Sequence, residues 1–184
     1  MPTERAHGVQ TMKMCEAFAK AGEEVELVLP RRFTKIKADP FDYYAVSQNF
    51  RIKKLPVLDL IPLDFIFGKL AFWVEALTFL FFAKIYLGFK NYDFLYTRED
   101  FAGFFFKDFF LEVHTLPARI RNASQLVILT SYLKKKLIES GFGGENILVA
   151  PDGIDFNEFQ VSVSKEEARR ELNLPLDKRI VMFI

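Results

Sequence analysis

The stretch LVILTSYLKKKLIESGFGGENILVAPDGIDFNEF, residues 126–159, predicts the fold class of this chain. Two short apolar runs, Leu126–Leu129 and Ile147–Ala150, flank a segment with helical periodicity. Ser131 can cap the N-terminus of that helix, and Gly141 can end it in a left-handed conformation. Strand, helix and strand in this order form a βαβ unit, whose strands pair in parallel. The stretch therefore predicts an α/β fold with a parallel sheet.

The rest of the chain continues the alternation of strands and helices. Asp39-Pro40 is a typical helix start, and Ser164 with Glu167 forms the pattern of a capping box. Ligands bind beyond the carboxyl ends of parallel strands, so the residue after each strand is a candidate site residue. We expect further strands at Val25–Leu29, Phe50–Leu55, Phe94–Thr97, Phe109–Val113 and Ile180–Ile184. We expect helices at Gly8–Ala21 and Ser164–Leu172, one long helix or two over Asp64–Gly88, and a helical turn at Pro117–Ala123.

Composition excludes several classes of protein. The 184 residues are 51% hydrophobic, which is enough for one ordinary core. Lys and Arg number 25 against 24 Asp and Glu, so the chain lacks the basic excess of a nucleic-acid-binding protein. Cys15 is the lone cysteine, which indicates a reducing, cytoplasmic compartment. Because two histidines and one cysteine stand far apart, and no P-loop or G-x-G-x-x-G is present, we expect no metal and no cofactor.

Phenylalanine is unusually frequent, with 22 residues, many of them between Phe65 and Phe110. The segment Leu70–Phe89 is close to membrane-spanning length. Glu75 and Lys84 interrupt it, and each is costly at the centre of a bilayer. Two alternatives stay open: a helix buried in the protein, or a helix that lies against the inner face of a membrane.

Three short patterns resemble the N-terminal half of family-4 (group 1) glycosyltransferases of the GT-B fold. The first is the loop Pro151–Asp155 after its strand, with Asp152 where the family usually has Asn and Ile154 where it usually has Val. The others are residues 7–10, HGVQ, ahead of a helix, and residues 112–114, EVH, at a strand end. The resemblance implies a doubly wound, Rossmann-like parallel sheet that forms the acceptor side of the enzyme.

The resemblance also implies that the chain is a fragment. Residues 1–161 would be the acceptor-side domain without its first strand, which belongs between Val25–Leu29 and Phe94–Thr97. Residues 162–184 would be a linker helix and the first strand of a truncated donor-binding domain. Unpaired strand edges favour aggregation, so we expect the fragment to be marginally stable. Because the resemblance implies that the donor-binding half is missing, we also expect the fragment to be inactive alone.

Strand ends and the resemblance together select the candidate site residues. His114 follows a strand and is the candidate catalytic residue, since imidazole can donate to a sugar hydroxyl or to a leaving phosphate. His7 and Gly8 precede a helix N-terminus, where free N–H groups favour an anion. Some of the remaining candidates could equally well have a structural role, as a helix cap, in a turn or in an Arg98–Asp100 surface pair. The remaining candidates for the cleft, expected on a common rim, are Arg98, Glu99, Thr130, Ser131, Asp152, Gly153 and Asp155.

The resemblance implies a retaining glycosyltransferase. It would move a sugar from a nucleotide-sugar donor to the hydroxyl of a glycan or lipid-linked acceptor, without a metal. Three alternatives stay open: a non-catalytic Rossmann-like module that binds an anionic small molecule, a GT-B sugar epimerase, and a membrane-surface interaction protein built around Leu70–Phe89.

Overall fold

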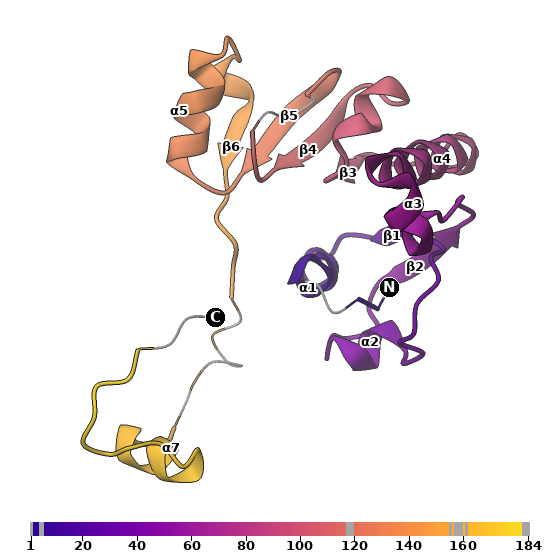
Figure 1. Ribbon diagram of the computed structural model, residues 1–184. Coiled ribbons are helices and arrows are strands. Elements are labelled where there is room, and N and C mark those ends of the chain that lie inside the picture. The colour runs from indigo at the N-terminus through magenta and orange to yellow at the C-terminus, as the bar shows by residue number, and fades with distance from the viewer. Residues whose placement is uncertain are drawn as a thin grey trace. The chain divides into compact units, whose positions relative to one another are not determined.

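The structure is a computed structural model that describes residues 2–3, 6–116, 120–154, 156, 160 and 162–181 (Figure 1). The chain divides into two units, Met1–Asp152 and Gly153–Ile184. The first unit is an α/β structure whose strands all pair in parallel, which confirms the predicted fold class at this level. The domain boundary expected after residue 161 lies inside the second unit and stays a prediction.

Helices and strands alternate along the first unit much as predicted. Of the two alternatives for residues 64–88, the structure has two helices, because Gly68 adopts a left-handed φ of 52° and separates α3 from α4. The strand expected from Leu126 begins three residues earlier, and the strand expected from Phe94 is confined to two residues. Of the helical turn expected at 117–123, residues 117–119 lie outside the described part and Ala123 is in a strand. The elements are α1 Ala6–Lys20, β1 Glu26–Pro30, α2 Pro40–Tyr43, β2 Arg51–Leu55, the 3-10 helix η1 Ile61–Leu63, α3 Asp64–Phe67, α4 Lys69–Leu87, β3 Tyr96–Thr97, the 3-10 helix η2 Asp100–Phe104, β4 Phe109–Val113, β5 Ala123–Ile128, α5 Ser131–Glu139, the 3-10 helix η3 Gly144–Asn146 and β6 Ile147–Val149.

The strands form two sheets rather than the single sheet expected. β1 pairs with β2, and β3, β4, β5 and β6 pair in that order. Within the described residues, no strand pairing joins β1 to β3. The break therefore falls where the sequence analysis places the absent strand.

Two helices bridge the break, one on each side. Neighbouring residues of a strand point to opposite faces. In β1, Leu27 packs against the core cluster that contains Met12 of α1, while Val28 packs against the core cluster that contains Leu80 of α4. The phenol of Tyr86 in α4 also donates to the Glu26 carboxylate at 2.9 Å. Helices α1 and α4 therefore cover opposite faces of the β1–β2 pair.

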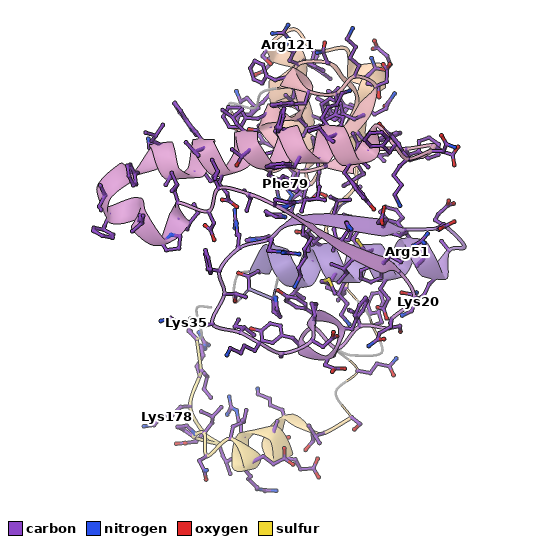
Figure 2. All side chains as sticks on the ribbon, turned by 90° about the vertical axis from the view of Figure 1, so that its right-hand side faces the viewer. Lys20, Lys35, Arg51, Phe79, Arg121 and Lys178 are labelled. Atoms are coloured by element: carbon purple, nitrogen blue, oxygen red, sulfur yellow. The ribbon has the colours of Figure 1, made fainter. Side chains whose placement is uncertain are left out.

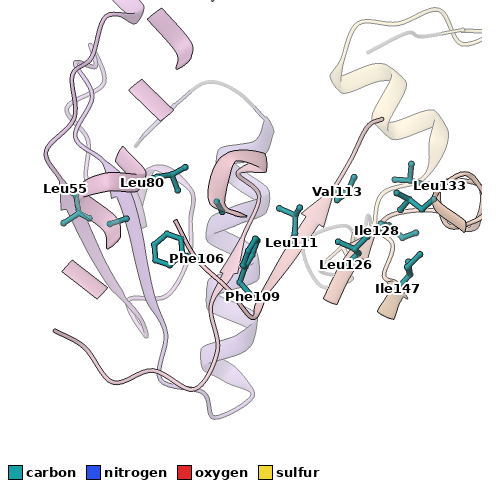
Figure 3. Close-up of a cluster of buried hydrophobic side chains, with 13 residues drawn as sticks. Leu55, Leu80, Phe106, Phe109, Leu111, Val113, Leu126, Ile128, Leu133 and Ile147 are labelled. Carbon is teal, nitrogen blue, oxygen red and sulfur yellow. The ribbon is translucent and has the colours of Figure 1, made fainter. Parts of the chain in front are cut away.

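The larger core cluster follows one face of the four-stranded sheet. Alternate residues of β4, Phe109, Leu111 and Val113, are fully or nearly fully buried there. Figure 3 shows this row continuing from Leu55 and Leu80 through Phe106 to Ile128, Leu133 and Ile147. Phe79, labelled on α4 in Figure 2, packs against the same cluster. Because β4 buries its odd-numbered residues, Glu112 must point to the other face, towards α1.

Local signals explain several helix ends. Asp39 caps α2 by accepting from the Phe41 N–H at 2.8 Å, which confirms the predicted start. Gly141 follows α5 with a φ of 95°, a conformation that glycine adopts without strain. The N-cap of α5 is Thr130 and not the predicted Ser131, since the Thr130 hydroxyl accepts from the Leu133 N–H at 3.2 Å.

The second unit contains α7, Lys165–Glu171. Its capping box is confirmed: Ser164 Oγ accepts from the Glu167 N–H at 3.2 Å, and Glu167 Oε2 accepts from the Ser164 N–H at 2.8 Å. The strand expected at 180–184 is not formed at Ile180 and Val181, and its other residues lie outside the described part.

Candidate functional site

A polar cluster lies at the carboxyl ends of β3 and β4. Arg98 follows the last residue of β3, and His114 follows the last residue of β4. Because the two strands are parallel neighbours, both residues come to the same edge of the sheet. The guanidinium Nη2 of Arg98 lies 2.7 Å from Nε2 of His114.

Glu112 is the buried anchor of this cluster. Its side chain is only 3% exposed, yet its carboxylate contacts Gln10 of α1 and three polar partners from β3, β4 and the residues that follow these strands. The Tyr96 hydroxyl donates to Oε2 at 2.7 Å, Arg98 Nε lies 3.5 Å from Oε1, and His114 Nε2 contacts Oε1 directly. Burial, followed by the bond to the Glu112 carboxylate, raises the pKa of Tyr96, so its hydroxyl remains a donor. A carboxylate this deeply buried is stabilised by such donors.

The Nε2 atom of His114 has two possible hydrogen-bond partners. Its Nε2 contacts both the Arg98 guanidinium, which can only donate, and the Glu112 carboxylate, which accepts. A protonated Nε2 donates to Glu112, whereas a deprotonated Nε2 accepts from Arg98. The two bonds exclude each other, so the presence of a hydrogen on Nε2 determines whether His114 bonds to Glu112 or to Arg98.

Gln10 of α1 joins this cluster to the loop after β6. Its Oε1 accepts from Arg98 Nη1 at 3.0 Å, and its Nε2 donates to Asp152 and lies 3.5 Å from Glu112. Gln10 and Asp152 are 142 positions apart in sequence. His7 precedes Gln10 by three residues, which places it on the same side of α1. Gln10, Arg98, His114 and Asp152 thus bring together α1, the ends of β3 and β4, and the loop after β6. The wider rim expected with His7 and Asp155 stays a prediction.

The cluster carries more negative than positive formal charge, apart from His114. The one arginine, Arg98, lies among two carboxylates, Glu112 and Asp152. The side chains of Arg98 and His114 remain 25% and 28% exposed, so a ligand can reach them. Such an arrangement of donors and acceptors suits hydroxyl groups better than a free anion, because the arginine is already matched by a carboxylate.

Several predicted site residues have structural roles instead. Gly8 is buried, and a side chain there would collide with the Tyr44 hydroxyl, so the close approach that glycine permits is to Tyr44. Arg98 pairs with Glu112 rather than in a surface pair with Asp100. Glu99 caps η2 by accepting from the Phe101 N–H at 3.4 Å.

Glu99 also lies close to other acids. Burial, together with the carboxylates of Asp100 and Glu75, raises its pKa. Thr130 caps α5, and Ser131 is the first residue of that helix. Gly153 has no left-handed φ, so its turn does not require glycine, and Asp155 lies outside the described residues.

Two hollows lie away from the cluster. One, of about 290 Å³, is lined by residues that follow β1 and β2, including Arg31, Phe33 and Asp59. Another, of about 560 Å³, is lined by residues that precede β3 and β4, including Lys90 and Asp108, and so lies at the amino edge of the strands. The larger hollow is therefore at the opposite edge of the sheet from His114.

Gln10, Tyr96 and Glu112 are not among the site residues predicted from the sequence. Glu112 carried a signal, since a carboxylate inside the apolar strand FFLEV needs buried partners. Gln10 lies one helical turn after His7, which is a weaker signal. Tyr96 had none, because a tyrosine is ordinary in a strand.

Within the described part of the chain, no group of three His, Cys, Asp or Glu side chains is placed to hold a metal ion. The sequence matches no model of a known protein family, and no curated protein matches it.

Proposed function

We propose that this chain supplies the acceptor-side half of a retaining GT-B glycosyltransferase, with a doubly wound, Rossmann-like arrangement of its strands. The proposal is supported chiefly by one observation: Arg98 and His114 lie side by side at the carboxyl ends of parallel strands, held by the buried Glu112. This edge is where open α/β sheets bind ligands. The sequence resemblance to family-4 glycosyltransferases supports the same assignment.

The balance of charge favours a sugar as the bound group. A sugar presents hydroxyls that both donate and accept, and the cluster offers Asp152 as an acceptor and Arg98 as a donor, with His114 able to do either. A module built for a small anion would need an uncompensated cation, but Arg98 faces Glu112. The alternative of an anion-binding module is therefore less well supported than sugar recognition.

The proposed reaction joins an acceptor hydroxyl to the anomeric carbon of a nucleotide sugar. The acceptor oxygen bonds to that carbon while the bond from the carbon to the diphosphate oxygen breaks, and the hydroxyl proton leaves with the diphosphate. His114 and Arg98 hold the sugar in position, and His114 also donates to developing negative charge. The nucleotide sugar is a substrate, so no cofactor is assigned.

The test uses the complete product of the gene that encodes this chain. It is incubated with UDP-glucose or GDP-mannose and an acceptor mixture of glycans and lipid-linked sugars, and nucleoside diphosphate release is measured. We expect release that falls by about a hundredfold or more in Arg98→Gln and in His114→Asn. Arg51→Gln serves as the matched control, because Arg51 forms an exposed pair with Glu24 away from the cluster.

Three outcomes would contradict the proposal. Donor binding without any release would indicate a binding module. A changed sugar without a glycosylated acceptor would indicate an epimerase. Equal activity of Arg98→Gln and Arg51→Gln would show that the cluster takes no part in the reaction.

A further inference from the structure

Helix α4 has an apolar side that the protein leaves uncovered. Leu70, Trp73, Leu77, Phe81 and Ile85 recur at three- and four-residue spacing and form one side of the helix, here called the α4 apolar face. Each of these side chains is between 40% and 53% exposed. In Figure 2, α3 and the first turns of α4 extend past the β1–β2 pair with their side chains pointing outward. Phe65 and Ile66 of α3, both well exposed, prolong the apolar surface.

The size of this surface is unusual for a protein in water. An aromatic side chain has roughly 150–250 Å² of surface to bury, so the exposed parts of Trp73, Phe81 and Phe65 alone amount to on the order of 350 Å². The exposed leucine and isoleucine side chains of α3 and α4 add to this area. The largest apolar patch on a typical soluble monomer is about 300–600 Å². An exposed apolar surface of this extent indicates that another molecule binds there.

The opposite side of α4 is firmly attached to the protein. Ala76, Leu80 and Ala83 are buried there, and Glu75, only 2% exposed, accepts from Arg32 Nη2 at 2.5 Å. Among the described residues, α4 is the one helix long and apolar enough to cross a membrane, and 28% of its apolar window is buried. Crossing would break the contacts of Glu75 and its neighbours, whereas lying flat on a membrane preserves them.

The charges of α4 select the kind of surface that it fits. The helix has three charged residues, and the one acid, Glu75, is buried and paired with Arg32. The exposed charges of α4 are therefore Lys69 and Lys84, both positive. Two copies joined through this face would bring lysines together without an acid from α4 to match them. Anionic lipid headgroups, in contrast, attract lysine, and aromatic rings suit the boundary between headgroups and acyl chains.

We propose that α4 lies flat on an anionic membrane surface, with the α4 apolar face inserted among the lipid headgroups. The inference rests on the exposure and charge of α4 and does not depend on the proposed sugar transfer. It makes this chain a peripheral membrane protein that recognises negatively charged lipid.

The test is flotation of the 184-residue chain with lipid vesicles on a density gradient. One set of vesicles is pure phosphatidylcholine, and in the other about a third of the lipid is phosphatidylglycerol. We expect the chain to float with the anionic vesicles, and the double variant Trp73→Ser/Phe81→Ser to lower its partition coefficient about tenfold or more. Lys69→Gln/Lys84→Gln is expected to lower binding to the anionic vesicles alone, also by about tenfold.

The matched control is Tyr132→Ser/Leu148→Ser, which removes two large side chains from α5 and β6 that are even more exposed than Trp73 and Phe81. This control should bind like the unchanged chain. Far-UV circular dichroism checks that each variant is folded, and Leu77→Ser offers a milder change to the same face. No flotation, or flotation that the α4 changes leave unaltered, would overturn the proposal. A lipid-free dimer in sedimentation velocity that Trp73→Ser/Phe81→Ser abolishes would assign the face to a second copy instead.

Discussion

Glu16 offers a quantitative test of how α1 is held in place. This carboxylate is 7% exposed and accepts from the Ser47 backbone N–H at 2.8 Å, with Lys20 Nζ at 3.1 Å. Burial alone would raise its pKa, but the Ser47 and Lys20 donors outweigh burial and lower the pKa from 4.5 to about 2. The same helix carries Gln10 into the candidate site, so the anchoring of α1 bears on the geometry of that site.

The sign of the pH effect follows from the lowered pKa. The native state holds the ionised form of Glu16 more tightly than the unfolded state does, so the contribution to stability is complete above about pH 5 and is lost as the pH falls towards 2. A lowering from 4.5 to about 2 corresponds to at most about 3 kcal/mol. Roughly 2 kcal/mol of this is lost between pH 7 and pH 3.

The assay compares urea unfolding of the unchanged chain and of Glu16→Gln at both pH values. Glutamine keeps an acceptor for the Ser47 N–H but cannot ionise, so the difference in unfolding free energy should shrink by about 2 kcal/mol from pH 7 to pH 3. Glu139→Gln is the control, because Glu139 forms an exposed pair with Lys136 at 3.1 Å and should change stability by less than about 0.5 kcal/mol. A difference for Glu16→Gln that is the same at both pH values would refute this account of α1.

Two further predictions concern residues first selected as site candidates. Gly8→Ala should lower the free energy of unfolding by about 1–3 kcal/mol, because its new Cβ would collide with the Tyr44 hydroxyl. Adding Tyr44→Phe should recover part of this loss in urea titrations, and no recovery would mean that the collision is elsewhere. Thr130→Ala should lower the free energy of unfolding by about 1 kcal/mol, because the helix cap is lost, whereas Ser131→Ala should lower it by less than about 0.5 kcal/mol. A larger loss for Ser131→Ala than for Thr130→Ala would place the cap at Ser131.

Local signals in the sequence were sufficient for the α/β class and for most elements. The apolar run of Phe109–Val113 and the capping residues Asp39 and Ser164 each depend on neighbours a few positions away, so they can be recognised without a fold. The cap at Thr130 was misplaced by one residue, because both Thr130 and Ser131 have a suitable hydroxyl. Only the backbone conformation distinguishes them.

The site needed the tertiary structure. Sequence alone placed Arg98 and His114 at strand ends, because that position follows from where each apolar run stops. It could not select Gln10, whose contact with Glu112 spans 102 positions and depends on how α1 lies across the sheet. Asp152 was selected from the sequence, but its contact with Gln10 could not be, because that contact depends on β6 ending at the same edge.

Tertiary packing also decided what each charge and each apolar surface does. The sequence left open whether Leu70–Phe89 is buried, and the structure buries one side of α4 while exposing the other, since its neighbours cover a single face. Arg98 could have bound an anion, but folding sets Glu112 beside it and satisfies its charge. Periodicity and caps are encoded within a few residues of each element, whereas partners, burial and net charge at a site exist only after distant segments have packed together.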